Sequence, residues 1–124
     1  IYGLDRVDYS KRIYITEGPI DSLFLNNGIA VSGSSFNLPS VSSLKSISTI
    51  CFDNEPRSKP ITNLILKMID LGYSVYLPPD NIVEKDINDL IISGKTSIEI
   101  MKMIDENTYQ GAPALLRFNY WRKC

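Results

Sequence analysis

The stretch IYITEGPIDSLF, residues 13–24, predicts a β-strand that turns directly into a helix. Residues 13–16 are rich in β-forming side chains, Gly18 ends the strand, and Pro19 suits the first turn of a helix. We expect this helix to run from Pro19 to Asn27, where an Asn-Gly pair ends it.

The apolar residues of the expected helix share one side. Ile20, Leu23 and Phe24 have the spacing i, i+3 and i+4, which predicts a single buried face. Residues 29–31 are expected to form a second, short buried strand, so a βαβ unit spans residues 13–31.

A second unit of the same kind begins at residues 49–52, TICF, a continuous apolar run typical of a strand buried on both faces. A helix is expected over residues 60–71 and a further strand over residues 73–77. Two βαβ units joined by a loop predict an α/β protein with a parallel sheet. Three more helices are expected, over residues 86–93, 97–106 and 112–121.

The connection over residues 32–48 is rich in serine. We expect a loop with one weak helical turn near residues 39–44, because small polar side chains bury little surface. A phosphate-binding turn at Ser32–Ser35 is the alternative, although the stretch lacks the Lys-Ser/Thr ending of a P-loop.

Composition excludes several classes of function. The 124 residues include 44% hydrophobic and 22% charged residues, which is enough for one buried core without disulfides or structural zinc. The two cysteines, Cys51 and Cys124, form no CxxC pair. A net charge of −1 disfavours electrostatic binding of duplex DNA. With no histidine, the chain lacks a Ser-His-Asp triad and the usual zinc sites.

The ends and hydropathy of the chain suggest its context. No apolar stretch approaches the roughly 20 residues of a membrane span, and the N-terminus has no signal-peptide pattern, so we expect a cytoplasmic protein. The chain begins at Ile1 without a methionine, which we interpret as an excised domain or a processed product.

Acidic residues follow two of the expected strands. Glu17 closes the first strand, and Asp53 and Glu55 follow the third with their side chains on the same side. Ligands of open parallel sheets bind beyond the carboxyl ends of the strands, where these three carboxylates are expected to converge. Such a cluster needs a cation, and Mg²⁺, which prefers oxygen ligands, is the natural candidate. Strand-end acids that cap helices or pair with basic residues are the alternative.

Three motifs resemble those of Toprim domains. Residues 16–23, TEGPIDSL, contain a Glu-Gly pair followed three residues later by Asp, at a strand-to-helix turn. Residues 53–55, DNE, resemble the Asp-x-Asp of the second motif, and residues 85–90, KDINDL, resemble a segment of Toprim primases. The similarity extends over nearly the whole chain to the DNA primases of T-even-type bacteriophages, through residues 1–3, 17–24, 53–57 and 110–111.

This resemblance implies a Toprim (Rossmann-like) fold of about four parallel strands flanked by helices, with extra C-terminal helices. It implies a catalytic domain over residues 1–106 and a helical tail over residues 107–124. The implied activity is Mg²⁺-dependent synthesis of short RNA primers from ribonucleoside triphosphates on single-stranded DNA, with Mn²⁺ as a substitute. The implied partners are the replicative helicase and an upstream zinc ribbon of the same protein, in the host cytoplasm. We expect the domain alone to fold but to be inactive.

The resemblance also implies roles for individual residues. Glu17 would be a general acid/base or a metal-linked carboxylate, while Asp53, Glu55 and Asp86 would bind Mg²⁺. Glu55 replaces the commoner Asp of the second motif, which changes its reach toward the ion. Asn88 stands where many relatives have a carboxylate, which weakens the case for a second full metal site.

Other residues have two interpretations each. Asp21 would complement the dipole of its helix, or would support Glu17 or the metal together with Gly18. Arg57 and Lys59 would bind phosphates of the substrate or template, or remain solvated. Lys85 would bind phosphate or offset the acidic cluster.

The tail over residues 117–123 mixes three cations with three aromatics, a composition suited to single-stranded DNA or a partner protein. A terminal helix that buries Leu115, Leu116, Phe118 and Trp121 is the interpretation we favour.

Two alternatives to primer synthesis remain open. A Toprim nuclease or topoisomerase domain would cleave strands, although none of the seven tyrosines has a recognisable nucleophilic setting. A receiver-like binding module would use Asp53 as a phosphoacceptor, but receivers need an acidic pair after the first strand, where only Glu17 is present.

Overall fold

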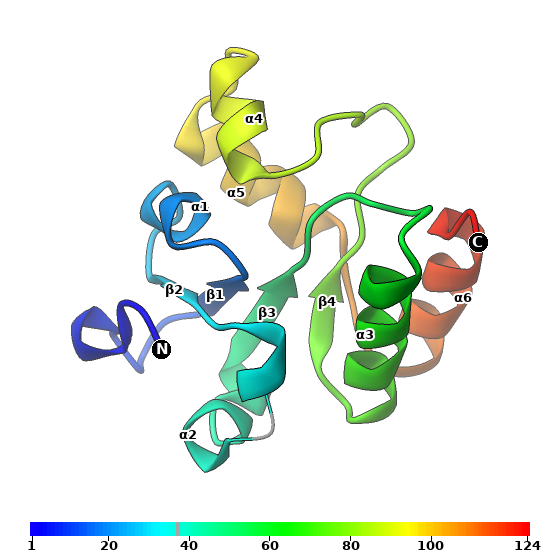
Figure 1. Ribbon diagram of the computed structural model, residues 1–124. Coiled ribbons are helices and arrows are strands. Elements are labelled where there is room, and N and C mark those ends of the chain that lie inside the picture. The colour runs from blue at the N-terminus through cyan, green and yellow to red at the C-terminus, as the bar shows by residue number, and fades with distance from the viewer. Residues whose placement is uncertain (37) are drawn as a thin grey trace.

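Five strands form one sheet in the computed structural model, which describes residues 1–36 and 38–124 (Figure 1). Their order is β2-β1-β3-β4-β5, and the first four are parallel. The strands are β1 (Ile13–Thr16), β2 (Gly28–Ala30), β3 (Ser48–Cys51), β4 (Ser74–Tyr76) and β5 (Thr108–Tyr109). The expected four parallel strands are thus confirmed, and the structure adds β5, antiparallel to β4.

Helices cover both faces of the sheet (Figure 1). α3 and α6 lie side by side on one face, whereas α4 and α5 lie on the other, with α1 beside α4. The helices are α1 (Pro19–Leu23), α2 (Pro39–Ser42), α3 (Lys59–Asp70), α4 (Ile87–Ile92), α5 (Ser97–Glu106) and α6 (Gly111–Trp121). This three-layer α/β architecture is consistent with a Toprim-like, Rossmann-type fold.

Alternation along the strands divides the buried residues into two clusters. In β1, Ile13 and Ile15 pack toward α3 and α6, whereas Tyr14 between them packs toward α4 and α5. The same alternation places Ile50 and Cys51 of β3 on opposite faces. A strand buried on both faces reads as a continuous apolar run, which explains why these strands were predictable.

The predicted buried face of the first helix is wrong in part. α1 ends at Leu23, and Ile20 and Leu23 are 62% and 56% exposed. Asp21 and Ser22 are buried instead, because this side of α1 faces the sheet edge and α4, where Asp21 accepts a hydrogen bond from the Asn88 N–H. In a helix of five residues, one tertiary contact decides the orientation.

The serine-rich connection contains more structure than expected. The predicted helical turn is α2, and two 3₁₀ turns, η2 (Gly33–Ser35) and η3 (Lys45–Ile47), flank it. Phe36, Val41 and Leu44 are buried in the core, so the expectation of little burial is wrong. The Ser32 and Ser35 hydroxyls bond each other at 2.9 Å. The Ser34 side chain of the proposed phosphate turn, and residue 37 of the connection, lie outside the described part.

The tail forms a helix that joins the main core. Phe118 and Trp121 of α6 are buried, as predicted, whereas Leu115 and Leu116 are 39% and 74% exposed, contrary to prediction. The division of the chain into residues 1–106 and 107–124 stays a prediction. Among the described residues, no helix has the length and apolar character needed to cross a membrane.

Candidate functional site

Three carboxylates meet at the carboxyl edge of the parallel strands. Asp21 lies on α1, Asp53 follows β3, and Asp86 precedes α4, and one oxygen from each lies within 4.8 Å of the other two. The chain passes from β1 to β2 on one side and then returns to β3 on the other side of β1. The cluster therefore lies at the switch point where open α/β sheets bind ligands.

Asp21 is held in place by backbone groups. Its Oδ1 accepts a hydrogen bond of 2.9 Å from the N–H of Asn88, at the start of α4. Gly18 leaves room for this carboxylate, because a Cβ built there would lie 3.2 Å from Asp21 Oδ2. The sequence identified Asp21 and Gly18 as supporting residues, and the structure places Asp21 in the cluster itself.

Asp86 is the N-cap of α4. Its Oδ1 accepts a hydrogen bond of 2.8 Å from the Asp89 N–H, one of the amides that a helix start leaves unpaired. Capping uses one oxygen and fixes the side chain. Asp86 is thus a helix-capping acid, the role that the sequence offers as the alternative to metal binding. The same carboxylate also contributes to the cluster.

Burial and mutual repulsion raise the pKa values of two acids of the cluster. Burial, followed by the charges of Glu17, Asp21 and Asp86, raises the pKa of Asp53 to about 6. Burial also raises the pKa of Asp21, together with the charges of Asp86 and Asp89, against the Asn88 amide that lowers it. The site thus disfavours its own negative charge, and a bound cation would relieve that cost.

Glu17 lies beside the three carboxylates. It is half-buried, and its Oε1 is buried with no hydrogen-bond partner. Burial raises the pKa of Glu17, the Asp53 amide lowers it by hydrogen bonding, and the Glu55 charge raises it again. Buried polar atoms are normally hydrogen-bonded, so Glu17 Oε1 is available for a ligand or a proton at this edge of the sheet.

Glu55 pairs with Lys85 beside the acidic site. The Lys85 Nζ and Glu55 Oε1 atoms are 3.1 Å apart, and the lysine side chain is 57% exposed. Glu55 is not one of the three carboxylates that meet within 4.8 Å, but, in addition to burial, its charge still raises the pKa of Glu17. Its role as a metal ligand stays a prediction.

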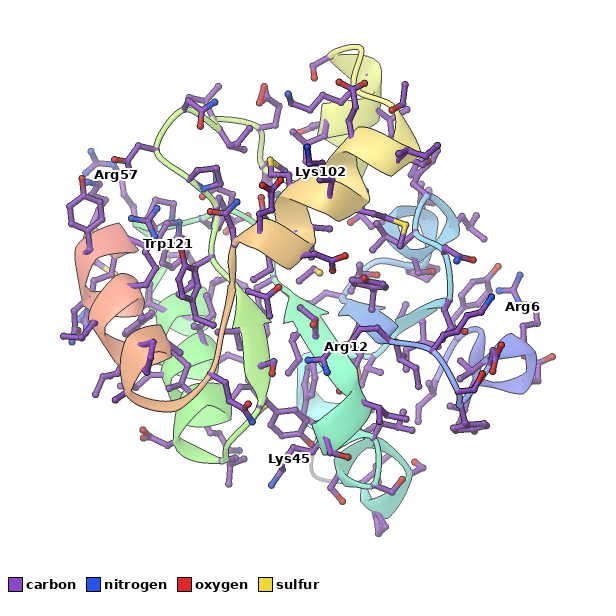
Figure 2. All side chains as sticks on the ribbon, turned by 180° about the vertical axis from the view of Figure 1, so that it is seen from behind. Arg6, Arg12, Lys45, Arg57, Lys102 and Trp121 are labelled. Carbon is purple, nitrogen blue, oxygen red and sulfur yellow. The ribbon has the colours of Figure 1, made fainter. Side chains whose placement is uncertain are left out.

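The predicted phosphate-binding cations lie outside the cluster. Arg57 and Lys59 are exposed, and Figure 2 shows Arg57 at the same corner of the molecule as Trp121. Lys85 is paired with Glu55, which fits the interpretation that it offsets the acids. Asn88 contributes its backbone N–H to Asp21.

Asn54 is a structural residue that sequence reasoning missed. Its side-chain amide donates to the carbonyls of Ile82 and Glu84 at 3.1 and 3.2 Å, and its Oδ1 accepts from Trp121 Nε1 at 3.0 Å. It thereby ties the loop that leads to Asp86, and the end of α6, to the end of β3. Its place between two acids is the one signal that the sequence offers.

A curated protein is similar to this chain along nearly its whole length. No protein-family model matches the chain. A curated protein named DNA primase, from Enterobacteria phage T4, is 37% identical over 125 residues, which cover 99% of this chain. This chain is similar to part of a phage DNA primase. It spans 36% of that primase's length, so the similarity concerns one part of a larger protein.

The residues present fit a hard divalent cation. Three carboxylates within 4.8 Å supply oxygen ligands, and burial, together with the charges of neighbouring acids, raises the pKa values of Asp21 and Asp53. No histidine competes for a softer ion, since the sequence contains none. Mg²⁺ and Mn²⁺ are the ions that such an oxygen set suits.

Proposed function

We propose that the chain is the Toprim-type catalytic domain of a DNA primase, which synthesises short RNA primers on single-stranded DNA with Mg²⁺. The observation that carries the proposal is the convergence of Asp21, Asp53 and Asp86 at the switch point of the sheet. Similarity to the phage primase along 99% of the chain supports the same conclusion.

Asp21, Asp53 and Asp86 would hold the cation, and Glu55 would join them by leaving Lys85. A divalent cation there would stabilise the charge that develops on the transferring phosphate. Glu17 is the group that we assign to accept the proton of the 3′-hydroxyl, whose oxygen bonds to the α-phosphorus of the incoming ribonucleoside triphosphate while the bond to the departing pyrophosphate breaks. Because burial raises its pKa, its carboxylate is a better proton acceptor than an exposed glutamate.

Basic residues around the edge would bind the phosphates. Lys85 lies beside Asp86, and Arg57 and Lys59 follow the loop after β3. The ligands would be ribonucleoside triphosphates and a single-stranded template. We further propose that the chain works with a replicative helicase and a zinc ribbon of the same protein, in the host cytoplasm. The catalytic groups of the proposed domain all lie within residues 1–106, and the helical tail over residues 107–124 completes its core.

Metal binding is the first test of this proposal. Mn²⁺ should broaden the NMR signals of residues around Asp53 in the isolated chain, and Asp53→Ala should weaken that binding by roughly tenfold or more. Asp70→Ala changes an exposed acid at the end of α3 and serves as the matched control. Equal Mn²⁺ binding by the two variants would contradict the assignment of Asp53 as a metal ligand.

The product of the reaction distinguishes primer synthesis from strand cleavage. The intact protein is supplied with single-stranded template, ribonucleotides and Mg²⁺. New short RNA that disappears with Asp53→Ala supports the primase, whereas nicked DNA supports the nuclease or topoisomerase alternative. The isolated chain is expected to bind the metal without making primers.

A further inference from the structure

A second hollow lies beside the acidic site and is not used by the proposed chemistry. It has a volume of about 380 Å³, at the lower end of the roughly 300–1,000 Å³ of small-ligand sites. Its lining comes from the loops after β3 and β4 and from the end of α6, with Asn54, Pro78, Pro79, Tyr120, Trp121 and Lys123. Asn54 and Pro78 also line the neighbouring hollow that contains Asp53 and Asp86.

Part of the lining of this hollow consists of apolar rings. Pro78, Pro79 and Trp121 line it, and Tyr120 beside them is 62% exposed. An exposed aromatic ring beside proline rings is a surface on which a planar heterocycle can stack.

Tyr120 is held in a defined position despite its exposure. Its hydroxyl donates to Asp80 Oδ2 at 2.9 Å, and the Arg117 guanidinium lies over its ring at 5.0 Å. Arg117 also donates to the Pro78 carbonyl at 2.8 Å and pairs with Asp80 at 3.5 Å. A ring that is fixed before binding loses less entropy when a ligand stacks on it.

The charges around the hollow suit a phosphate-linked ligand. Asp80 is the acid that lines it, and this carboxylate is already engaged by Arg117 and Tyr120. Lys123 lines the hollow, and its backbone N–H donates to the Pro56 carbonyl at 2.7 Å, which brings the loop containing Arg57 to this corner (Figure 2). Lys123 is thus the second charged residue in the described lining, and it is a cation.

We infer that this hollow, the Tyr120 pocket, binds one base of a single-stranded nucleic acid, with the adjoining phosphates near Lys123 and Arg57. The inference rests on the proposed function, because it places a strand beside the acidic site. An open hollow with one exposed tyrosine and flanking cations suits a base within a strand, whose neighbouring phosphates add to the binding.

Trp121 provides a direct probe, because it is the single tryptophan of the chain and lines the pocket. A twelve-residue oligothymidylate is titrated into the chain at low salt, with EDTA present so that metal binding plays no part. Tryptophan fluorescence reports occupancy of the pocket, and anisotropy of a labelled oligonucleotide reports affinity. We expect saturable quenching that weakens as salt is raised.

The variants identify the stacking residue. Tyr120→Ala should weaken binding by about tenfold, within the range for loss of one stacked base, whereas Tyr120→Phe keeps the ring and should stay within about threefold of the parent. Tyr9→Ala is the matched control, because Tyr9 is a similarly exposed tyrosine (59%) in the N-terminal segment. Circular dichroism checks that each variant is folded.

Three results would overturn the inference. They are absence of quenching, equal affinity of the Tyr120→Ala and Tyr9→Ala variants, and quenching by thymidine monophosphate at the same concentrations as by the oligonucleotide. The last result would indicate a pocket for free nucleotides. Because EDTA keeps the acidic site free of metal during this titration, and the Mn²⁺ titration contains no nucleic acid, failure of the pocket and failure of the metal site are distinguished.

Discussion

At the scale of single residues, the acidic site is an arrangement that costs stability when no cation is present. Asp53 is half-buried beside Glu17, Asp21 and Asp86, so its charged form is disfavoured. Its pKa is raised to about 6, compared with about 3.9 in an unfolded chain. Above pH 6 the folded state carries a charge that the unfolded state accommodates more easily.

Asp53→Asn should therefore stabilise the cation-free protein at pH 7.5. The gain in unfolding free energy should be on the order of 1 kcal/mol after solvent screening, and it should shrink as the pH falls from 6 toward 4, where both states bind the proton. Urea denaturation in EDTA at several pH values measures it. Asp70→Asn is the control, and a loss of stability at pH 7.5 in Asp53→Asn would contradict the prediction.

At the scale of elements, helix orientation depends on what each helix packs against. α5 is amphipathic in the ordinary way, with Ile100 and Ile104 fully buried under the sheet and a Thr96–Glu99 capping box at its start. α1 is too short for its apolar residues to determine its orientation, and it buries Asp21 while exposing Ile20 and Leu23. Placement of a carboxylate of the acidic site has taken precedence over burial of two apolar side chains.

This difference between the two helices predicts opposite effects of substitution. Leu23→Gln should change the unfolding free energy by less than about 0.5 kcal/mol, because the side chain is 56% exposed. Ile104→Ala should cost about 2–5 kcal/mol through loss of buried surface and the resulting cavity. Denaturant unfolding measures both changes, and a large loss in Leu23→Gln would show that the α1 surface is covered in solution.

At the scale of the whole molecule, the last helix completes the fold. Ala114, Phe118 and Trp121 of α6 belong to the same buried cluster as β1, β3 and α3. Trp121 is also bonded to Asn54 at the end of β3, so α6 connects the core to the edge that carries the acids. The helix therefore supports the site from a distance in sequence of more than sixty residues.

Phe118→Ala should cost about 3–5 kcal/mol of unfolding free energy, since the ring is fully buried. A chain that ends at residue 106 should lose cooperative unfolding, because it lacks β5 and α6 and exposes α3. Calorimetry and denaturant unfolding test both changes. Cooperative unfolding of the shortened chain would show that residues 1–106 fold independently.

Local sequence patterns determined most of the architecture. The apolar runs over residues 13–16 and 49–52 predicted strands, the Gly18-Pro19 pair marked the start of α1, and two βαβ units implied a parallel sheet. These features depend on the backbone preferences and spacing of neighbouring residues, which are visible in one dimension. The two-residue β5 has no such pattern, because its pairing with β4 is its main support.

The sequence by itself also predicted that Glu17, Asp53 and Glu55 converge at one edge, because acids that follow parallel strands meet there, and the family resemblance added Asp86. Only the tertiary structure decided which carboxylates converge: Asp21 joins Asp53 and Asp86, and Glu55 pairs with Lys85. It alone placed Asn54 between the acidic site and the Tyr120 pocket. The physical reason is that the direction of a side chain is chosen by partners distant in sequence, through hydrogen bonds and charge, and no local pattern records those partners.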